Sequence, residues 1–174
     1  MDLQLTTKAQ EAISAAVRRA TTDGNPQVEP AHLLAALADQ TDTTTAPLLE
    51  AVGTSPAAVR QTADAAIRQL PTAAGSSVQQ PSMSRALANV MEQARQLMSS
   101  MGDSFVSTDH LLVALARTGD FGLDAQALEA AIPATRGGSK VTSAEPEGTF
   151  EALEKYGTDL TAIARAGKLD PVIG

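Results

Sequence analysis

The sequence contains no cysteine and no tryptophan, and only four of its 174 residues are aromatic. Without cysteine there can be neither a disulfide framework nor thiolate chemistry. A surplus of basic residues is also missing, because 13 lysines and arginines stand against 20 aspartates and glutamates, a net charge of −7. Such a charge repels phosphate backbones and anionic lipids, so neither nucleic acid nor a membrane surface is an expected partner.

Targeting and membrane signals are scarce as well. The first ten residues, MDLQLTTKAQ, lack the basic start and the apolar run of a signal peptide. No stretch of the sequence approaches the roughly 18 consecutive apolar residues that a membrane span needs. The expected location is therefore cytoplasmic.

Catalytic motifs are absent from the sequence too. It has no G-x-x-x-x-G-K-[ST] phosphate loop and no G-x-S-x-G nucleophile motif. The two histidines, His32 and His110, have no cysteine or third histidine to complete a metal set. Each stands at the third position of an expected helix, so its ring either satisfies the helix start or serves as a ligand or base. The sequence predicts no catalytic residue, no metal site and no cofactor for this chain.

Alanine is abundant instead, with 33 residues, and it is the best helix former. In the first segment apolar side chains recur every three to four residues, as on one face of an α-helix, with Thr6 as the expected N-cap and Gly24 at the end. Three more helices are expected between Pro30 and Pro71. The first of these should turn three leucines inward: Leu33, Leu34 and Leu37.

The pattern of the first half returns in the second half. VEPAHLLAALA at residues 28–38 reappears as VSTDHLLVALA at residues 106–116, with seven of eleven positions identical at an offset of 78. The same offset carries the N-cap Thr6 to Ser84. The predicted fold class is therefore all-α, a pseudo-twofold double repeat of short-helix bundles in which each unit buries one face against its copy.

The double repeat is expected to occupy residues 1–136, with the first repeat at 1–71 and the second at 82–136. The second repeat is shorter and has room for one helix after its HLL segment, so we expect it to lack the short third helix. Residues 137–149 show no hydrophobic period and are expected to form a flexible linker. Residues 150–174 are expected to form a short helical tail.

Five segments occur together in a specific order. They are LTTKAQEAI, NPQVEPAHLLAAL, GDSFVSTDHLLVAL, RGGSKVTS and ALEKYGTDLTAIARAGKLDPVIG. In this order they resemble the N-terminal region of the ClpB family of disaggregases, and the resemblance covers the whole chain. The last segment is similar to the entry into the first AAA+ ATPase domain, so residues 150–174 are expected to be the start of that domain. The ClpC and ClpA families share a similar GKLDPVIG and are the alternative.

The resemblance implies a domain without catalysis that engages unfolded or aggregated polypeptides and passes them to a hexameric ATPase ring. It implies that ATP and Mg²⁺ are cofactors of the full-length protein only. It also implies a homohexamer formed through the ATPase domains and a DnaK-type chaperone as a partner. This chain by itself is then expected to be monomeric and unable to hydrolyse ATP.

Three other functions were weighed against this one. A domain of the ClpC or ClpA type would bind adaptors for a protease. A small helical enzyme would need a nucleophile, metal or phosphate constellation that the sequence does not show. A regulatory helical module would bind one folded partner, whereas the ClpB-type domain would prefer unfolded proteins.

The resemblance also implies residues that contact substrate: Thr6, Asp103, Asp109 and Met91. Thr6 stands in the family's LT pair, Asp103 in its GD pair, and Asp109 at a position where the family usually has glutamate, one methylene longer. Met91 matches a position in an apolar groove. All four also have structural interpretations: Thr6 as an N-cap, Asp103 as a turn residue, Asp109 as a first-turn anion and Met91 as a core methionine.

Overall fold

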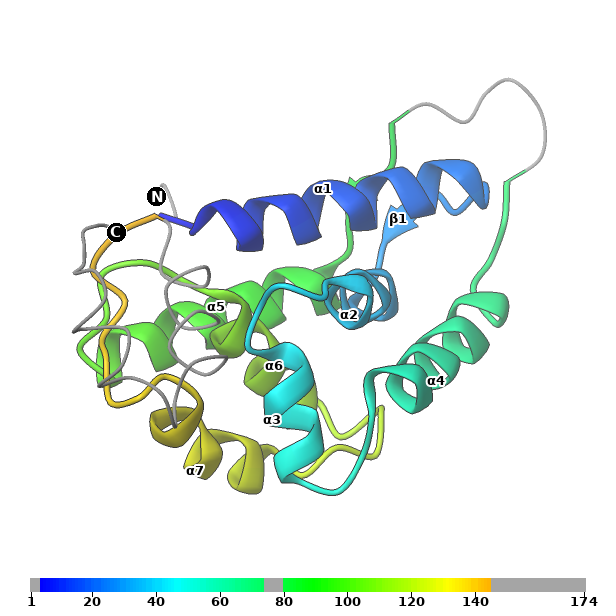
Figure 1. Ribbon diagram of the computed structural model, residues 1–174. Helices are drawn as coiled ribbons and strands as arrows, with labels where there is room; N and C mark the ends of the chain where they lie inside the picture. Colours follow the sequence, from blue (N-terminus) through cyan, green and yellow to red (C-terminus); the bar gives the residue numbers. More distant parts are fainter. Residues whose placement is uncertain (1–3, 74–79, 145–174) are drawn as a thin grey trace, which may run out of the picture.

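The computed structural model describes residues 4–73 and 80–144 of the chain (Figure 1). In chain order its elements are α1 (Thr7–Thr22), β1 (Gln27–Val28), α2 (Pro30–Asp39), α3 (Thr45–Ala51), α4 (Pro56–Arg68), β2 (Ser82–Met83), α5 (Arg85–Ser100), α6 (Thr108–Arg117) and α7 (Ala125–Thr135). The predicted all-α class is confirmed. No helix in the described part is long and apolar enough to cross a membrane.

Helices α1 and α5 begin in the same way, because a hydroxyl N-cap precedes each of them. Thr6 Oγ1 accepts a hydrogen bond from the Ala9 N–H (3.2 Å), and Ser84 Oγ accepts one from the Leu87 N–H (3.0 Å). Each helix then buries one stripe of side chains at intervals of three and four residues. The stripes are Ala9, Ala12, Ala16 and Ala20 in α1, and Leu87, Val90, Ala94 and Leu97 in α5.

In each repeat, the residue before the first helix pairs with the residue before the second helix of the other repeat. Val28 pairs in parallel with Met83, and Leu5 pairs in parallel with Val106. Adding 78 to Leu5 gives Met83, and adding 78 to Val28 gives Val106, so each pairing is a copy of the other. A pseudo-twofold axis between the repeats requires this reciprocity, because each patch must meet the equivalent patch of its copy.

The centre of the molecule is formed by α2 and α6. Every residue from Pro30 to Ala38 and from Thr108 to Ala116 is buried. Helix α2 contacts α1 and α4, helix α6 contacts α5 and α7, and the two central helices contact each other. The three leucines predicted to face inward are fully buried. These short helices are apolar on nearly all sides, so the other helices must enclose them.

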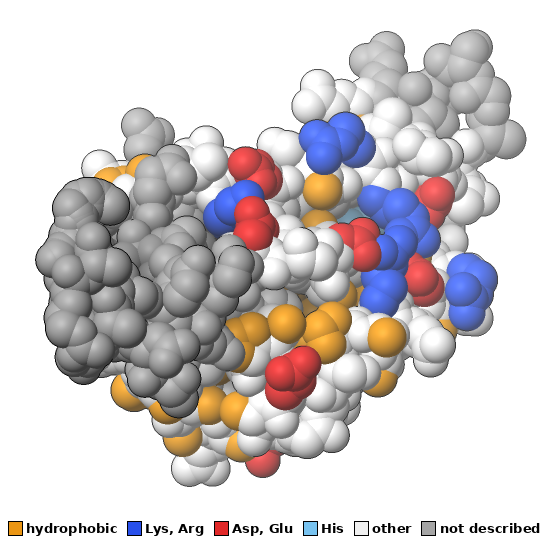
Figure 2. Space-filling model, viewed as in Figure 1, with side chains coloured by type: hydrophobic (Ala, Val, Ile, Leu, Met, Phe, Trp, Pro, Cys, Tyr) orange, Lys and Arg blue, Asp and Glu red, His pale blue; other side chains and the backbone are white. Residues whose placement is uncertain are grey.

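Charged side chains link α4 to the rest of the first repeat. Figure 2 shows Lys, Arg, Asp and Glu side chains gathered on the face where α1 and α4 lie. Arg19 of α1 bonds to Asp64 of α4 (3.2 Å), while Arg60 of α4 bonds to the same carboxylate (3.0 Å) and also pairs with Asp39 of α2. These half-exposed pairs orient α4 on its neighbours more than they stabilise it.

The second repeat has one helix after α6 within the described residues, as its length predicted. This helix, α7, is capped by Asp124, whose carboxylate accepts a hydrogen bond from the Ala127 N–H (3.0 Å). It contacts α6 of its own repeat and α3 of the other repeat. The short third helix of the first repeat thus packs where the two repeats meet.

The chain after α7 differs from the expected linker. Residues 139–144, which we name the exit segment, lie against the domain: Val141 is fully buried, and its carbonyl accepts a hydrogen bond from the Ser104 N–H (2.7 Å). The predicted flexible linker began at residue 137, whereas one buried apolar side chain and a few backbone hydrogen bonds place residues 139–144 against the domain without any periodic pattern. The rest of the predicted linker, 145–149, and the predicted tail, 150–174, lie outside the described residues.

Candidate functional site

An apolar groove runs between the two repeats. Its volume is about 380 Å³, and it is lined by Leu5, Ile13, Met83, Ala88, Met91, Glu92 and Arg95. Four of these residues form two pairs related by the offset of 78, Leu5 with Met83 and Ile13 with Met91. Equivalent positions of the two repeats therefore contribute facing parts of the lining. Met91, which the resemblance assigned to an apolar groove that contacts substrate, is one of these lining residues, and its contact with substrate stays a prediction.

The groove contains an exposed apolar side chain. Met83 is 49% exposed and is the one large hydrophobic side chain classed as exposed among the described residues. Solvation of such a side chain is unfavourable, and methionine adapts its shape to different apolar ligands. The groove can therefore accept apolar side chains of varied size.

An ion pair forms the charged part of the groove lining. Arg95 donates two hydrogen bonds to Glu92, from Nη2 (2.6 Å) and from Nε (3.0 Å). These bonds, with a further one from Gln96, lower the pKa of Glu92 to about 2. The two opposite charges are matched within one turn of α5, so the groove selects strongly for neither cationic nor anionic ligands.

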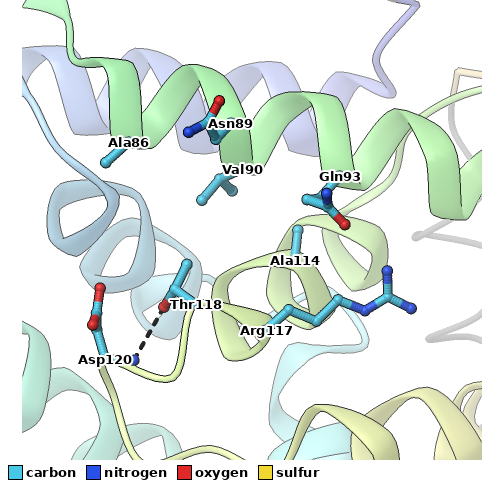
Figure 3. A pocket seen from close by; sticks show the side chains of 8 residues that line it. All are labelled: Ala86, Asn89, Val90, Gln93, Ala114, Arg117, Thr118 and Asp120. Atoms are coloured by element: carbon cyan, nitrogen blue, oxygen red, sulfur yellow. Dashed lines mark hydrogen bonds between the residues drawn. The ribbon is translucent and has the colours of Figure 1, made fainter.

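A second cavity of about 410 Å³ lies between α5 and α6 (Figure 3). It is more polar: Asn89, Gln93 and Thr118 contribute to its lining, and the Asp120 N–H donates to Thr118 Oγ1 (3.2 Å). Figure 3 shows the Arg117 side chain extending away from the middle of the cavity. It ends in an ion pair with Glu129 of α7 (2.8 Å).

The corresponding surface of the first repeat is occupied by its own side chains. Lys8, the counterpart of Ala86 in the second cavity, forms an ion pair with Asp42. Gln40, the counterpart of Thr118, donates a hydrogen bond to the Lys8 carbonyl (3.0 Å). The repeats thus share a backbone plan but differ in surface chemistry here, whereas the groove between them uses equivalent positions of both.

Thr6 is buried rather than displayed. Its exposed fraction is 0%, its hydroxyl caps α1, and its backbone N–H donates to the Val106 carbonyl (3.0 Å). Thr6 therefore has the geometry of the structural interpretation, at the joint between the repeats. Its neighbour Leu5 lines the groove, so Thr6 can influence the groove through the backbone.

Asp103 and Asp109 are brought together by a residue that the sequence did not single out. Arg136 lies between them, 1% exposed, and donates from Nε (2.8 Å) and Nη2 (3.0 Å) to the two oxygens of Asp109. Its Nη1 donates to Asp103 Oδ1 (3.0 Å). The two aspartates are 7% and 1% exposed, and neither they nor Thr6 line the groove with Met91.

Hydrogen bonds stabilise the ionised form of the two carboxyls in this buried cluster. Burial opposes ionisation of Asp103, but bonds from His110 and from the Val141 N–H outweigh it, so the pKa of Asp103 lies below its ordinary 3.8. Burial opposes ionisation of Asp109 as well, but the hydrogen bonds from Arg136 and Ser107 and the neighbouring positive charge together outweigh it, so the pKa of Asp109 is also lowered. Both carboxyls therefore remain ionised at neutral pH.

The two histidines take the structural role rather than that of a ligand or base. His32 Nδ1 accepts a hydrogen bond from the Glu29 N–H, and His110 Nδ1 accepts one from the Ser107 N–H, both at 2.9 Å. Each ring thus closes a capping box at its helix start. Among the described residues, no group of three or more His, Cys, Asp or Glu side chains is placed to hold a metal ion.

The remaining ring nitrogens point to different partners in the two repeats. Because Nδ1 accepts, Nε2 carries the proton and donates: to Asn25 Oδ1 from His32 (2.9 Å) and to Asp103 Oδ2 from His110 (2.7 Å). Burial and then the charge of Arg19 lower the pKa of His32, which keeps its ring neutral. Asn25 and Asp103 are equivalent positions, so one repeat uses a neutral partner where the other uses an ionic one.

Sequence reasoning missed Arg136. It stands in RGGSKVTS, a segment that has no hydrophobic period and was assigned mostly to the linker. Its partners Asp103 and Asp109 lie 33 and 27 residues away along the chain, a separation that no local pattern reports. The available signal was two acidic residues, Asp103 in the loop before α6 and Asp109 in its first turn, without a basic residue nearby in sequence.

The described residues thus form a double helical repeat, joined by reciprocal strand pairs, with an apolar groove between the repeats. The family model of the Clp repeat N-terminal domain matches residues 4–131. This chain belongs to that family.

Individual relatives agree with this assignment. The chain is 50% identical to the chaperone protein ClpB of Mycobacterium tuberculosis (strain H37Rv) over 178 residues, covering 97% of this chain and 21% of that protein. It therefore spans about a fifth of the length of the curated relatives it matches, and the predicted resemblance to ClpB is confirmed.

Solved structures share the fold. The Hsp104 N-terminal domain from Candida albicans superimposes with a TM-score of 0.67 at 19% identity, over 83% of this chain and 99% of that one. A ClpV N-domain in complex with a VipB peptide superimposes with a TM-score of 0.58 at 19% identity, over 75% of this chain and 85% of that one.

Proposed function

We propose that this chain is the substrate-engaging N-terminal domain of a ClpB-type ATP-dependent disaggregase, which binds unfolded or aggregated polypeptides in the groove between its repeats. The observation that supports this is the groove itself, with Met83 exposed and with Leu5, Ile13 and Met91 in its lining. Unfolded proteins expose apolar side chains that folded proteins bury, so an adaptable apolar groove favours them as ligands.

The size of the groove suits weak binding. Burial of one leucine-sized side chain contributes about 1.5–3 kcal/mol. Association costs about 4–15 kcal/mol in lost freedom of motion, so two or three inserted side chains yield only modest affinity. Weak sites become effective when several are tethered together, because the second contact is then intramolecular. A hexamer carrying six such domains would capture an aggregate that one domain releases quickly.

The other activities in this proposal belong to the part of the ClpB relatives that this chain does not cover. No phosphate-loop motif occurs in the 174 residues, so the proposal places ATP and Mg²⁺ binding in a further AAA+ domain. That domain would also form the homohexamer, cooperate with a DnaK-type chaperone and receive clients from the groove, in the cytoplasm. In this proposal Met91 contacts the client, while the buried Thr6, Asp103 and Asp109 act on client engagement indirectly.

The proposal is tested by binding of a permanently unfolded protein to the purified 174-residue chain. A fluorescently labelled, chemically unfolded protein should bind, and the same protein in its native state should not. Met83→Glu introduces a charge into the groove and should weaken this binding by about tenfold or more, since an unpaired charge opposes apolar ligands. Ala57→Glu places the same charge on the exposed face of α4 and is the matched control.

Two results would contradict the proposal. The first is equal binding of native and unfolded protein, which would favour a regulatory module with a folded partner. The second is unchanged affinity of the Met83→Glu variant, which would move the client site away from the groove.

A further inference from the structure

The same position in each repeat binds the chain that leaves that repeat. In the first repeat, Asn25 Nδ2 donates a hydrogen bond to the carbonyl of Pro71, which follows α4 (3.0 Å). In the second repeat, Asp103 Oδ1 accepts a hydrogen bond from the N–H of Val141, which follows α7 (2.9 Å). Because 25 and 103 differ by the repeat offset, this is one device used twice. The second copy uses a charged acceptor, which makes the stronger bond.

The exit segment, residues 139–144, makes three further polar contacts with the domain. The Ser104 N–H donates to the Val141 carbonyl (2.7 Å), the Thr7 N–H donates to the Ala144 carbonyl (2.8 Å), and Lys140 Nζ donates to the Met101 carbonyl (2.7 Å). The Val141 side chain is fully buried. Figure 1 shows the segment, in orange, running from α7 to the N-terminal end of α1.

The buried cluster orients the carboxylate that binds this segment. Asp103 Oδ1 accepts from both Arg136 Nη1 and the Val141 N–H, while Asp103 Oδ2 accepts from His110. Arg136 is held in turn by both oxygens of Asp109. Arg136 directly follows the last residue of α7, so one guanidinium ties the end of that helix, the start of α6 and the loop before α6 together.

We infer that Asp109, Arg136 and Asp103 form an anchor that holds the exit segment on the domain and fixes its last residue, Ala144, near the groove. The last residue of the exit segment, Ala144, accepts a hydrogen bond from the Thr7 N–H. Leu5, two residues before Thr7, lines the groove. Asp103, Asp109 and Arg136 are thus positioning residues for whatever follows the domain. The anchor does not depend on what occupies the groove, so it stands or falls separately from the proposed function.

Amide hydrogen exchange tests the anchor at three N–H groups: Thr7, Ser104 and Val141. The first variant is D103N/D109A/R136M, which removes all three charges together and leaves no isolated buried charge. The second is Val141→Pro, which deletes the N–H that Asp103 accepts and leaves the cluster intact. Both should exchange at least about tenfold faster at Thr7 and Ser104, with unchanged rates in α2, because only the segment is released.

Asn25→Ala is the matched control, since it removes the equivalent contact of the first repeat. It should speed exchange at Ala73, whose N–H bonds to the Gly24 carbonyl, and leave Ser104 and Val141 unchanged. The chain has no cysteine, so a nitroxide on Ala144→Cys provides a second readout. It should broaden the methyl signals of Leu5 in the native chain and do so less in the Val141→Pro variant.

Native exchange rates at Thr7 and Ser104 in a folded variant would overturn the anchor. If the triple variant does not fold, the Val141→Pro variant decides. Broadening at Leu5 that is equal in the native chain and in that variant would equally overturn the inference.

Discussion

Arg136 is a buried cation with two buried anionic partners, so its environment matters for stability. Desolvating three charges is costly, and only their close mutual geometry offsets the cost. Removal of one partner is therefore far more damaging than removal of an exposed charge. His32 is a second residue whose buried environment affects stability, because its neutral ring forms part of a helix start.

For Arg136→Met we expect a loss of about 3–5 kcal/mol in the free energy of unfolding, because two buried carboxylates lose their cation. Arg117→Met removes a half-exposed pair with Glu129 and should cost less than about 1 kcal/mol. Urea unfolding followed by circular dichroism measures both. Similar small losses for the two variants would show that the buried cluster contributes no more than a surface pair.

The lowered pKa of His32 predicts a loss of stability in mild acid. Below its ordinary pKa of 6.5 the unfolded chain binds a proton that the native ring does not, so the free energy of unfolding decreases as the pH falls through that value. The contribution is fully present above pH 6.5. His32→Gln keeps an acceptor for the Glu29 N–H and should flatten the slope of stability against pH between 7.5 and 5.5, measured by urea unfolding. An identical slope in the two proteins would contradict this.

At the scale of helices, the equivalent elements of the two repeats provide internal controls. Thr6 and Ser84 cap α1 and α5 with the same bond, although one is threonine and the other is serine. Thr6→Ser should therefore be tolerated, while Thr6→Ala and Ser84→Ala should each cost about 1 kcal/mol, as lost N-caps do. Thermal melting measures all three. If Thr6→Ala lowers client binding further than Ser84→Ala at equal stability, Thr6 has a role in the groove beyond capping.

Helices α1 and α5 form equivalent walls of the groove, so mutations in the two walls should have matching effects. Ile13→Ser and Met91→Ser remove apolar area at positions related by the repeat offset. Each should weaken binding of an unfolded protein by about five- to thirtyfold, in line with the loss of about 1–2 kcal/mol of apolar contact. Fluorescence anisotropy with the same labelled ligand measures both variants. A loss confined to one wall would indicate that clients use one repeat only.

For the whole molecule, the anchored exit segment moves the end of the ordered domain beyond residue 136. Lys140 and Arg136 are both potential trypsin sites, but Lys140 lies in the anchored segment and Arg136 is buried. Limited trypsin digestion should therefore leave a stable fragment that still contains residue 140, since cleavage requires local opening. Mass spectrometry of the fragment measures this. Rapid cleavage after Arg136 or Lys140 would restore the boundary that the sequence alone suggested.

The sequence by itself determined the helices, the caps Thr6 and Ser84, the double repeat and the family. Terminating glycines illustrate why: Gly24 (φ 72°) and Gly102 (φ 76°) lie at equivalent positions in the left-handed conformation that favours glycine, a requirement of the local chain. The groove residue Met91 was also predicted, although from the resemblance and not from periodicity.

Only the tertiary structure decided what the polar residues do. Helical periodicity reports which face of a helix is buried, but it cannot report which distant side chain meets that face. Arg136 reaches Asp103 and Asp109 because α7 packs on α6, and Val141 is buried because the chain turns back toward α1. An ionised group can be buried only where other elements supply its partners. The acidic residues predicted to contact substrate are therefore buried and hold elements of the fold together.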